Sequence, residues 1–420
     1  MIKIEKLGES EVISRRGGAV ADVSAAVSEI IADVRRNGDE ALLRLCEKFD
    51  GARPDRLEVS EEELAAALEK ADKKLMEILE KAAENIRRFH SAQLRNGFSI
   101  GFADGTVLGQ RISPIERAGL YIPGGTAAYP STVLMNCIPA KIAGVGEIIM
   151  CSPAKNGIIN PDIAAAAKIA GVDRIFKLGG AQAIAAMAYG TESVPRADKI
   201  TGPGNAYVAE AKRQIYGAAG IDMIAGPSEI LIVADAAGDP KMLAADMLSQ
   251  AEHDANASAV LITDSPELAR ATAEEIERLL ADLPRRDIAG ASIENNGRII
   301  IAGNISEAIE AANALAPEHL ELCVDEPFEW LDKVMHAGSV FLGRHCPEAV
   351  GDYWAGANHT LPTGGTARFS SALSVDDFMK KTQYIYYTPA ALDAAADDIA
   401  YFAEKEGLTG HARSALSRRS

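Results

Sequence analysis

The stretch RIFKLGGAQAIAAM, residues 174–187, contains the repeating unit from which the fold can be predicted. Residues 174–178 form a short apolar run typical of a buried strand, Gly179 and Gly180 form a turn, and residues 182–187 are typical of a helix. This order of strand, turn and helix recurs along the chain, in the runs 148–151, 163–170, 199–201, 207–215, 230–233, 242–251, 259–263, 267–280, 298–302, 305–315 and 339–342. The alternation predicts an α/β protein with open parallel sheets.

The glycine-rich turns between these runs are candidate binding segments, because ligands of open parallel sheets bind outside the carboxyl ends of the strands. The turns are Gly124-Gly125, Gly179-Gly180, Gly202-Pro203-Gly204-Asn205 and Gly226-Pro227-Ser228. None of them forms G-x-G-x-x-G at the start of a helix with an acidic residue about 20 positions later. The turns alone are compatible with a phosphate site, a nucleotide site or a purely structural role.

Two amphipathic helices are predicted before the first strands, over residues 20–49 and 61–93. The second opens on Ser60 and Glu63 at the spacing of a capping box. His90 lies near the end of this helix, where we expect a solvated or dipole-complementing histidine and not a catalytic one.

The last residues, 393–416, are Ala-rich and predicted to be helical with a break at Gly407. Such a tail can bury little surface by itself, so we expect it to dock on a second subunit.

Composition narrows the class of protein. A chain of 420 residues exceeds what one hydrophobic core normally serves, so at least two domains are expected. The net charge of −17, with the basic residues scattered among acids, argues against nucleic-acid binding. No apolar run has the length of a signal peptide or a membrane span, which predicts a soluble cytoplasmic protein with no membrane partner. The cysteines form no C-x-x-C pair, and most are expected to be buried.

The stretch GDYWAGANHTLPTGGTARFSS, residues 351–371, is the most prominent candidate for a functional loop. It contains many polar and titratable side chains among four glycines and has neither helical nor strand periodicity. Such loops often carry chemistry on a rigid scaffold, although a solvated surface loop has the same composition.

Side chains that can bind a metal occur in three segments. Gln250 and His253 are three residues apart on a predicted helix, which places both on one face. Asp352, His359 and His411 add a carboxylate and two imidazoles. Oxygen and nitrogen donors without a thiolate suit zinc, with manganese or cobalt as substitutes. Taken alone, each histidine could equally be a cap or a solvated side chain.

Glu318 and His319 are neighbours in a predicted loop before an apolar run. A carboxylate beside an imidazole supplies two proton acceptors with different intrinsic pKa values, which suits proton abstraction. A turn with exposed polar groups is the alternative.

Taken together, the motifs resemble the histidinol dehydrogenase family from about residue 20 to the C-terminus. The similar segments occur in the family's order: GLYIPGGTA from Gly119, KLGGAQAIAA from Lys177, DKITGPGNAYVAEAK from Asp198, AGPSEIL from Ala225, SQAEHD from Ser249, APEHLEL from Ala316, GSVFLG from Gly338, GDYWAGANHTLPT from Gly351 and LTGHARS from Leu408.

The resemblance implies a zinc-dependent enzyme that oxidises L-histidinol through L-histidinal to L-histidine with two molecules of NAD, the last step of histidine biosynthesis. It implies His319 as the general base and Glu318 as the acid/base that activates water. The implied zinc ligands are Gln250, His253, Asp352 and His411, all of which also contact the substrate, as does His319. Further implied substrate contacts are Ser228, His359 and Glu406, and implied NAD contacts are Tyr121, Gln182 and Asn205.

The family's architecture implies a homodimer with two incomplete Rossmann-like domains, small terminal helical segments, and one metal ligand, His411, supplied by the partner subunit. The predicted parts are an N-terminal arm (1–20), a discontinuous first α/β domain (21–120 with 229–370), a second Rossmann-like domain (121–228) and a C-terminal dimerisation segment (371–420).

Other functions remain open at the level of sequence. A relative on the same scaffold could oxidise another small polar alcohol, such as a sulfonated diol, although Ser228, His359 and Glu406 favour histidinol. A zinc hydrolase uses the same types of group, and a non-catalytic binding protein would have no need of the Glu318–His319 pair.

The second oxidation has an alternative route through a thiohemiacetal on a reactive cysteine. Cys137 and Cys151 lie in the appropriate half of the chain, but no motif marks either of them.

Overall fold

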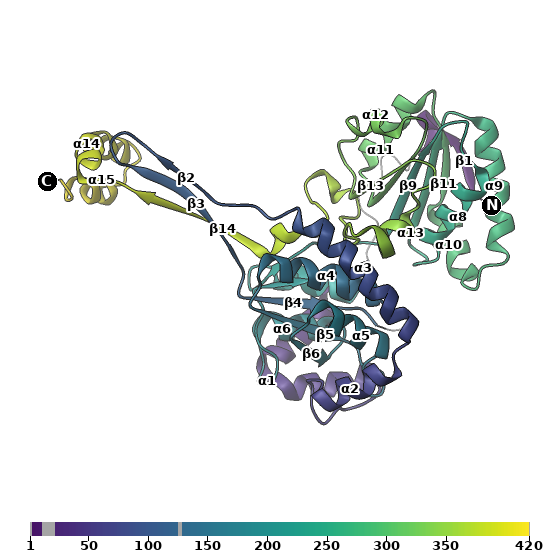
Figure 1. Cartoon of the computed structure of the whole chain (residues 1–420), viewed down its shortest axis with the longest axis horizontal. Helices are drawn as coiled ribbons and strands as arrows, with labels where there is room; N and C mark the ends of the chain where they lie inside the picture. Colours follow the sequence, from purple (N-terminus) through teal and green to yellow (C-terminus); the bar gives the residue numbers. More distant parts are fainter. Residues whose placement is uncertain (1, 11–21, 125–127, 420) are drawn as a thin grey trace. The chain divides into compact units, whose positions relative to one another are not determined.

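The computed structural model describes residues 2–10, 22–124 and 128–419 of the chain (Figure 1). The chain forms two compact units. Unit 1 comprises Met1–Gln93 and Glu116–Phe378, and unit 2 comprises Leu94–Ile115 and Met379–Ser420. Gly125, one of the predicted turn residues, lies outside the described residues.

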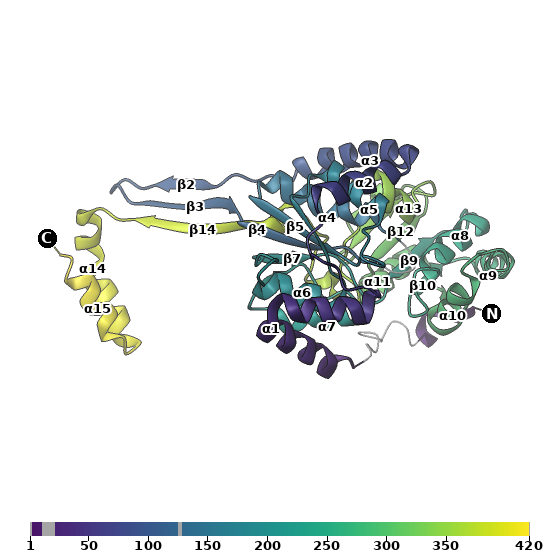
Figure 2. The same cartoon turned by 90° about the horizontal axis from the view of Figure 1, so that it is seen from below.

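A six-stranded parallel sheet in unit 1 has the strand order β1-β11-β10-β9-β12-β13. Its strands are β1 (Lys3–Lys6), β9 (Glu229–Ala234), β10 (Ser258–Thr263), β11 (Arg298–Ile301), β12 (His319–Cys323) and β13 (Ser339–Leu342). One face packs against α8 (Pro240–Ala251), α9 (Pro266–Leu280) and α10 (Arg286–Asn296), the other against α11 (Ile305–Leu315) and α12 (Pro327–Leu331) (Figures 1 and 2). Burial on both faces explains why the central strands β9 and β10 are almost continuously apolar.

A five-stranded parallel sheet, also in unit 1, has the order β6-β5-β4-β7-β8. Its strands are β4 (Arg117–Tyr121), β5 (Glu147–Ser152), β6 (Arg174–Lys177), β7 (Lys199–Thr201) and β8 (Gly220–Ile221). The helices around it are α1 (Ser24–Asp50), α2 (Glu61–Lys70), α3 (Lys73–Ser91), α4 (Pro130–Ala143), α5 (Pro161–Ala170), α6 (Gly180–Tyr189) and α7 (Ala206–Ile215).

The two sheets share one topology. Numbered along the chain from β4 or from β9, the strands of each sheet follow the order 3-2-1-4-5. This is the Rossmann order without its sixth strand. The predicted α/β class with two incomplete Rossmann-like sheets is therefore confirmed, and the quoted stretch 174–187 forms β6 and α6 as expected.

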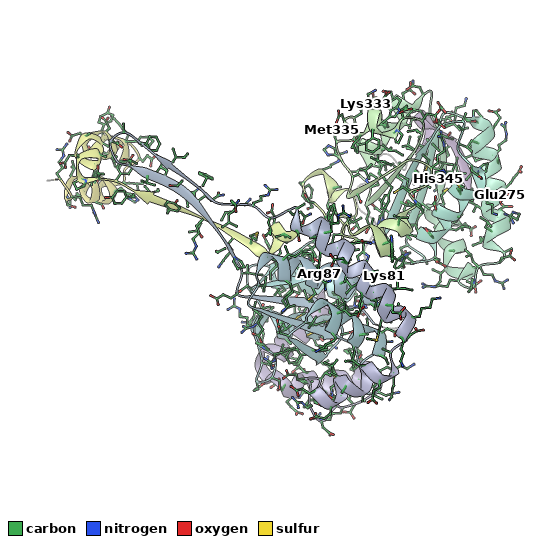
Figure 3. All side chains as sticks on the ribbon, in the orientation of Figure 1. Lys81, Arg87, Glu275, Lys333, Met335 and His345 are labelled. Atoms are coloured by element: carbon green, nitrogen blue, oxygen red, sulfur yellow. The ribbon has the colours of Figure 1, made fainter. Side chains whose placement is uncertain are left out.

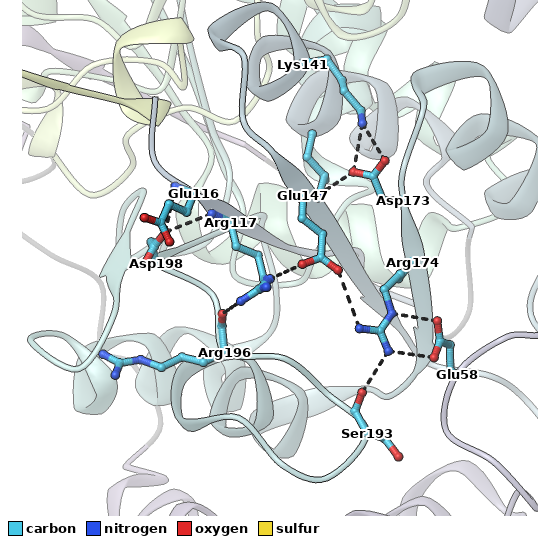
Figure 4. Close-up of polar contacts among 11 residues, drawn as sticks. Glu58, Glu116, Arg117, Lys141, Glu147, Asp173, Arg174, Ser193, Arg196 and Asp198 are labelled. Atoms are coloured by element: carbon cyan, nitrogen blue, oxygen red, sulfur yellow. Dashed lines mark hydrogen bonds and ion pairs between the residues drawn. The ribbon is translucent and has the colours of Figure 1, made fainter. Parts of the chain in front are cut away.

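Charged side chains join the amino ends of three strands of the five-stranded sheet (Figure 4). Arg117, Glu147 and Arg174 are the first residues of β4, β5 and β6. Glu147 pairs with Arg117 and lies 3.7 Å from Arg174, which forms two further bonds of 2.8 Å with Glu58. Each partly exposed pair contributes little stability. The network lies at the amino edge of these three strands.

The division of the chain into four parts remains a prediction. Two segments, however, pack against a different sheet from the one to which that division assigns them. The sequence predicts residues 21–120 to belong with 229–370, whereas α1 packs against α6 and α7 in the core of the five-stranded sheet. β4 is the central strand of that same sheet. The arm contributes β1 to the edge of the other sheet. Helical periodicity reveals an apolar face but not the partner against which it packs.

The helix predicted over residues 61–93 is divided into α2 and α3. The capping box of Ser60 and Glu63 is confirmed at the start of α2. Asp72 starts a new helix because its side chain accepts a hydrogen bond from the Leu75 N–H. α3 carries exposed side chains such as Lys81 on its outer face (Figure 3).

The prediction of a solvated His90 is wrong. Its side chain is fully buried, and Nδ1 lies 2.7 Å from Oε1 of Gln93. Burial lowers the pKa of His90. The sequence near the end of α3 does not indicate this burial. Asn358, which lies 3.5 Å from Nε2 of His90, comes from a distant part of the chain.

Unit 2 consists of an antiparallel sheet and a helical hairpin. The sheet has the order β14-β3-β2, with β2 (Phe98–Gly101), β3 (Val107–Pro114) and β14 (Met379–Tyr386). The helices α14 (Pro389–Lys405) and α15 (Thr409–Leu416) are separated at Gly407, as predicted. β14 is not apparent in the sequence, since nearly all of its residues are exposed and it lacks a buried face.

No helix in the described part of the chain is long and apolar enough to cross a membrane.

A buried ion pair holds the turn that follows β7. Gly202 has φ 116°, and a Cβ there would lie 2.0 Å from the Tyr121 carbonyl oxygen. The Asp222 carboxylate accepts a 2.8 Å hydrogen bond from the Gly202 N–H, while Lys212 donates to the Gly202 carbonyl oxygen at 2.9 Å. Lys212 and Asp222 pair with each other, and both side chains are almost completely buried.

We expect Lys212→Met to lower the free energy of unfolding by about 3–5 kcal/mol, because it leaves the Asp222 charge buried without a partner. Arg213→Met is the matched control, since the neighbouring Arg213 forms an exposed pair with Glu210 and should change stability little. Urea unfolding of both variants measures the difference. Equal midpoints would show that the buried pair does not stabilise the turn.

Candidate active site

The predicted acid–base pair lies at the amino ends of two neighbouring strands. His319 is the first residue of β12 and is in register with Ile230 of β9. The turn Gly226-Pro227-Ser228 leads into β9. The turn follows β8 of the five-stranded sheet, and it also lies at the amino end of β9, the strand beside β12. Glu318 and His319 are both buried, not exposed in a loop.

The backbone N–H and carbonyl groups of one residue, Glu229, orient both members of the pair. The N–H of Glu229 donates to Oε2 of Glu318 at 2.9 Å, and the carbonyl oxygen of Glu229 lies 3.0 Å from Nδ1 of His319. Because a carbonyl oxygen only accepts, Nδ1 carries the proton of the neutral ring and Nε2 is left as a proton acceptor.

The free ring nitrogen of His319 faces carboxylates. Nε2 is buried without a hydrogen-bond partner among the described residues. It lies 3.7 Å from Glu348 Oε1 and 3.8 Å from Asp352 Oδ1. Burial lowers the pKa of His319 to about 4, so the imidazole is neutral at pH 7. A neutral imidazole with an unoccupied acceptor is suited to take a proton from a ligand.

Burial acts on Glu318 in the opposite direction. Desolvation raises the pKa of its carboxyl well above the ordinary value, and the nearby acids Glu229 and Asp352 add to the effect. A carboxyl with a raised pKa holds a proton more tightly than an ordinary carboxyl and is a stronger base once ionised.

Three side chains form a cluster that can hold a metal ion. Ligand atoms of His253, Glu348 and Asp352 all lie within 4.8 Å of one another. His253 follows α8, Glu348 begins α13 (Glu348–Val350), and Asp352 lies in the π-helix η3 (Gly351–Ala355). Glu348 is a residue that the sequence reasoning missed. Its spacing of four from Asp352 would have indicated a shared helical face.

Gln250 joins this cluster through Glu348. Its side chain is fully buried, and the amide is satisfied when its nitrogen donates to both carboxylate oxygens of Glu348, at 2.7 and 2.9 Å. In this orientation the amide oxygen points away from the Glu348 carboxylate. Gln250, His253 and Asp352, all predicted as ligands, thus gather around one further acid.

The donor set fits a cation such as zinc. It combines an imidazole, an amide and carboxylates, with no thiolate. Desolvation raises the pKa of Glu348 well above the ordinary value, and Asp352 and Glu318 raise it further. Buried acids in this proximity are costly unless a cation or a proton balances them.

The remaining predicted substrate and metal residues lie in several places. His359 is half-buried in unit 1, with Nε2 3.3 Å from Thr132 Oγ1. Ser228 is held at the start of β9 by a bond from the Ser258 N–H to its carbonyl oxygen. Glu406 and His411 belong to unit 2, at the end of α14 and on α15, and both are exposed.

The residues predicted to contact NAD share one cavity. Tyr121, Gln182 and Asn205 line a cavity of about 1180 Å³ together with Gly124, Gly179 and Gly180. Tyr121 is the last residue of β4, and the other residues follow β4, β6 or β7. All of them therefore lie at the carboxyl edge of the five-stranded sheet. The Tyr121 hydroxyl accepts a 3.0 Å hydrogen bond from the Gly180 N–H, and Asn205 caps α7. The volume is of the size found for cofactor sites.

The two cysteines considered for a thiol route are buried in the core. Cys137 lies inside α4 and Cys151 inside β5, and both are fully inaccessible to solvent. Burial raises the pKa of Cys137 to about 12 and that of Cys151 further. Neither thiol has the properties of a nucleophile.

Comparison with known proteins agrees with this geometry. The family model of histidinol dehydrogenase matches residues 13–419. The chain is 55% identical to the histidinol dehydrogenase of Streptococcus mutans, covering 93% of this chain and 92% of that protein, and 51% identical to that of Geobacter sulfurreducens, covering 97% and 96%. The crystal structure of histidinol dehydrogenase from Elizabethkingia anophelis superposes with a TM-score of 0.94 at 39% identity, covering 99% of this chain and 98% of that one. The chain belongs to the histidinol dehydrogenase family.

Proposed function

We propose that this protein is an NAD-dependent L-histidinol dehydrogenase, which oxidises L-histidinol through L-histidinal to L-histidine as a cytoplasmic step of histidine biosynthesis. The observation that carries the proposal is the neutral, buried His319, whose free Nε2 lies beside a metal-binding cluster. An imidazole in this state can accept the proton of a carbinol whose oxygen and amine are held by a neighbouring cation.

Zinc in this site would polarise the bound alcohol and orient the carbinol carbon towards the nicotinamide that accepts hydride. Gln250, His253 and Asp352 would hold it, with His411 of the partner subunit as the fourth ligand. Glu348 would fix the Gln250 amide by accepting its two N–H bonds. Ser228, His359 and the partner subunit's Glu406 would contact the substrate.

His319 would act in the first oxidation. Its Nδ1–H is fixed by the Glu229 carbonyl oxygen, so only Nε2 is available for proton transfer. The side chain is further restricted by Phe341, whose ring centre lies 6.0 Å away. Nε2 would take the alcohol proton as hydride leaves the carbinol carbon for NAD.

Glu318 would act in the second oxidation. Its carboxyl is held by the Glu229 N–H and lies 3.7 Å from the His319 ring, in a site largely closed to solvent. Glu318 would deprotonate a water molecule that adds to the aldehyde. The resulting hydrate would then give up the second hydride to a second NAD. The aldehyde would remain bound between the two oxidations.

We further propose that unit 2 assembles with a second copy of the chain. Its sheet and helices expose large apolar side chains, including Ile100, Phe102, Ile385, Tyr401 and Phe402. The described core of its helical hairpin is a small alanine cluster. Apolar exposure of this extent is typical of an interface. Dimerisation would cover it and would deliver His411 and Glu406 to the partner's site.

The test of the function is the ratio of NADH formed to L-histidinol consumed. We expect a ratio near two, loss of activity on treatment with a zinc chelator, and recovery when zinc is returned. A ratio near one, with release of the aldehyde, would contradict the two-step scheme. Faster turnover of a sulfonated diol would identify a different substrate, and amide or ester cleavage without NADH would indicate a hydrolase.

Variants of three histidines distinguish metal ligands from the base. We expect His253→Asn and His411→Asn to lower zinc content and activity together. His319→Asn should keep the metal and lower the turnover number by roughly 10²- to 10⁴-fold, because only proton transfer is lost. Zinc per chain, measured by mass spectrometry, and NADH formation provide the two readouts.

His345→Asn is the matched control for these variants. His345 is an exposed residue beyond β13 (Figure 3) and is not one of the cluster residues His253, Glu348 and Asp352, so neither readout should change. Unchanged zinc content in His253→Asn or His411→Asn would show that the ligand set is misassigned.

Replacing both Cys137 and Cys151 with alanine should leave at least roughly a tenth of the activity, because neither buried thiol can act as a nucleophile. The double variant is to be assayed for the complete oxidation of L-histidinol and for its thermal midpoint. A loss of several orders of magnitude in a folded variant would revive the thiohemiacetal route.

A further inference from the structure

The cavity at the carboxyl edge of the five-stranded sheet contains an acid that the proposed reaction does not use. Asp50 is the last residue of α1 and lines this cavity with Tyr121, Gln182 and Asn205. A negative charge at the C-terminus of a helix opposes the helix dipole. Helix stability therefore does not explain an acid at this position, and conflicts of this kind often mark functional sites.

The carboxylate of Asp50 has an unused acceptor. Its Oδ2 atom is buried and has no hydrogen-bond partner among the described residues. Burial raises the pKa of Asp50 to about 6. Buried carboxylate oxygens are normally hydrogen-bonded, so an orphaned oxygen on a residue that lines a cavity is consistent with a donor supplied by a bound ligand.

Asp33 provides a comparison within the same helix and the same cavity. Its carboxylate accepts hydrogen bonds from Asn37 at 2.6 Å and from Arg44 at 3.0 Å. Because the chain already satisfies Asp33, a ligand has little to gain there. Asp50 is the acid in this wall with an orphaned oxygen in the described structure.

The residues that line the cavity indicate which part of a dinucleotide it would hold. Glu318, His319, His253 and Asp352 are not among the lining residues. The nicotinamide must reach those groups, so the cavity would receive the other end of NAD, the adenosine half. Its ribose presents two neighbouring hydroxyl groups, which a carboxylate can accept as paired donors.

We propose that Asp50 accepts hydrogen bonds from the adenosine ribose of NAD and, through its negative charge, disfavours the 2′-phosphate of NADP. This inference rests on the proposed use of NAD. In a Rossmann fold the ribose-binding acid follows the glycine turn by about 20 residues. Here it would come from α1, a helix that precedes the five-stranded sheet in sequence and packs onto it.

The test compares Asp50→Asn with the wild-type protein and with Asp33→Asn, a matched variant of the satisfied acid. Binding of NAD, of NADP and of NAD lacking the adenosine 2′-hydroxyl is measured by calorimetry, and KM and kcat are measured with L-histidinol. We expect Asp50→Asn to weaken NAD binding by about 10- to 100-fold, as for a lost bond to a charged group, while kcat at saturating NAD changes little. Asp33→Asn should leave NAD binding close to that of the wild type.

Two ratios separate ligand binding from a structural role. The preference for NAD over NADP should fall in Asp50→Asn. Removal of the 2′-hydroxyl from NAD should weaken binding strongly in the wild type and little in Asp50→Asn. The reason is that the change in the ligand and the change in the protein remove the same interaction. A variant that is only destabilised would change neither ratio.

Unchanged ratios in a folded Asp50→Asn protein would overturn the proposal. If Asp50→Asn does not fold, Asp50→Ser is used in its place. Equal binding of NAD and of NAD lacking the adenosine 2′-hydroxyl by the wild-type protein would also overturn the proposal. Failure of the wild type to form NADH from L-histidinol would refute the proposed function instead. Because binding is measured without turnover, it tests Asp50 in either case.

Discussion

The backbone of Glu229 is the constraint on which the acid–base chemistry of this protein depends. Its carbonyl oxygen fixes Nδ1 of His319, and its N–H fixes the Glu318 carboxylate. Both bonds follow from the parallel register of β9 and β12, which places His319 opposite Ile230. A side-chain network can rearrange at low cost, whereas the backbone at the start of a central strand cannot move without disturbing the sheet. The tautomer of the imidazole is therefore set by the fold.

The two sheets share the strand order 3-2-1-4-5, but their candidate sites lie at opposite ends of the strands. In the five-stranded sheet, Tyr121 and the turns after β6 and β7 line a cavity at the carboxyl edge, as expected for a doubly wound sheet. In the six-stranded sheet, Glu318 and His319 lie at the amino ends of the strands. The same topology thus places glycine-rich turns beside a cavity at the carboxyl edge of one sheet and titratable side chains at the amino edge of the other.

Burial gives the site both its reactivity and its need for a cation. Desolvation lowers the pKa of His319 to about 4 and raises the pKa values of Glu318 and Glu348. A neutral imidazole is thereby available as a base at neutral pH. Burying several acids close together costs free energy, which a bound cation would offset. The potential metal ligands therefore lie beside the base.

The sequence by itself determined the α/β class, most helices and strands, the capping box at Ser60 and the family, because periodicity, caps and motif order are local in the chain. It could not place α1 on the five-stranded sheet, bury His90 or reveal β14. It also missed Glu348, and Asp50 carried no motif. Each of these depends on contacts between distant segments, and only the tertiary structure decides which side chains lose their water and which atoms they meet.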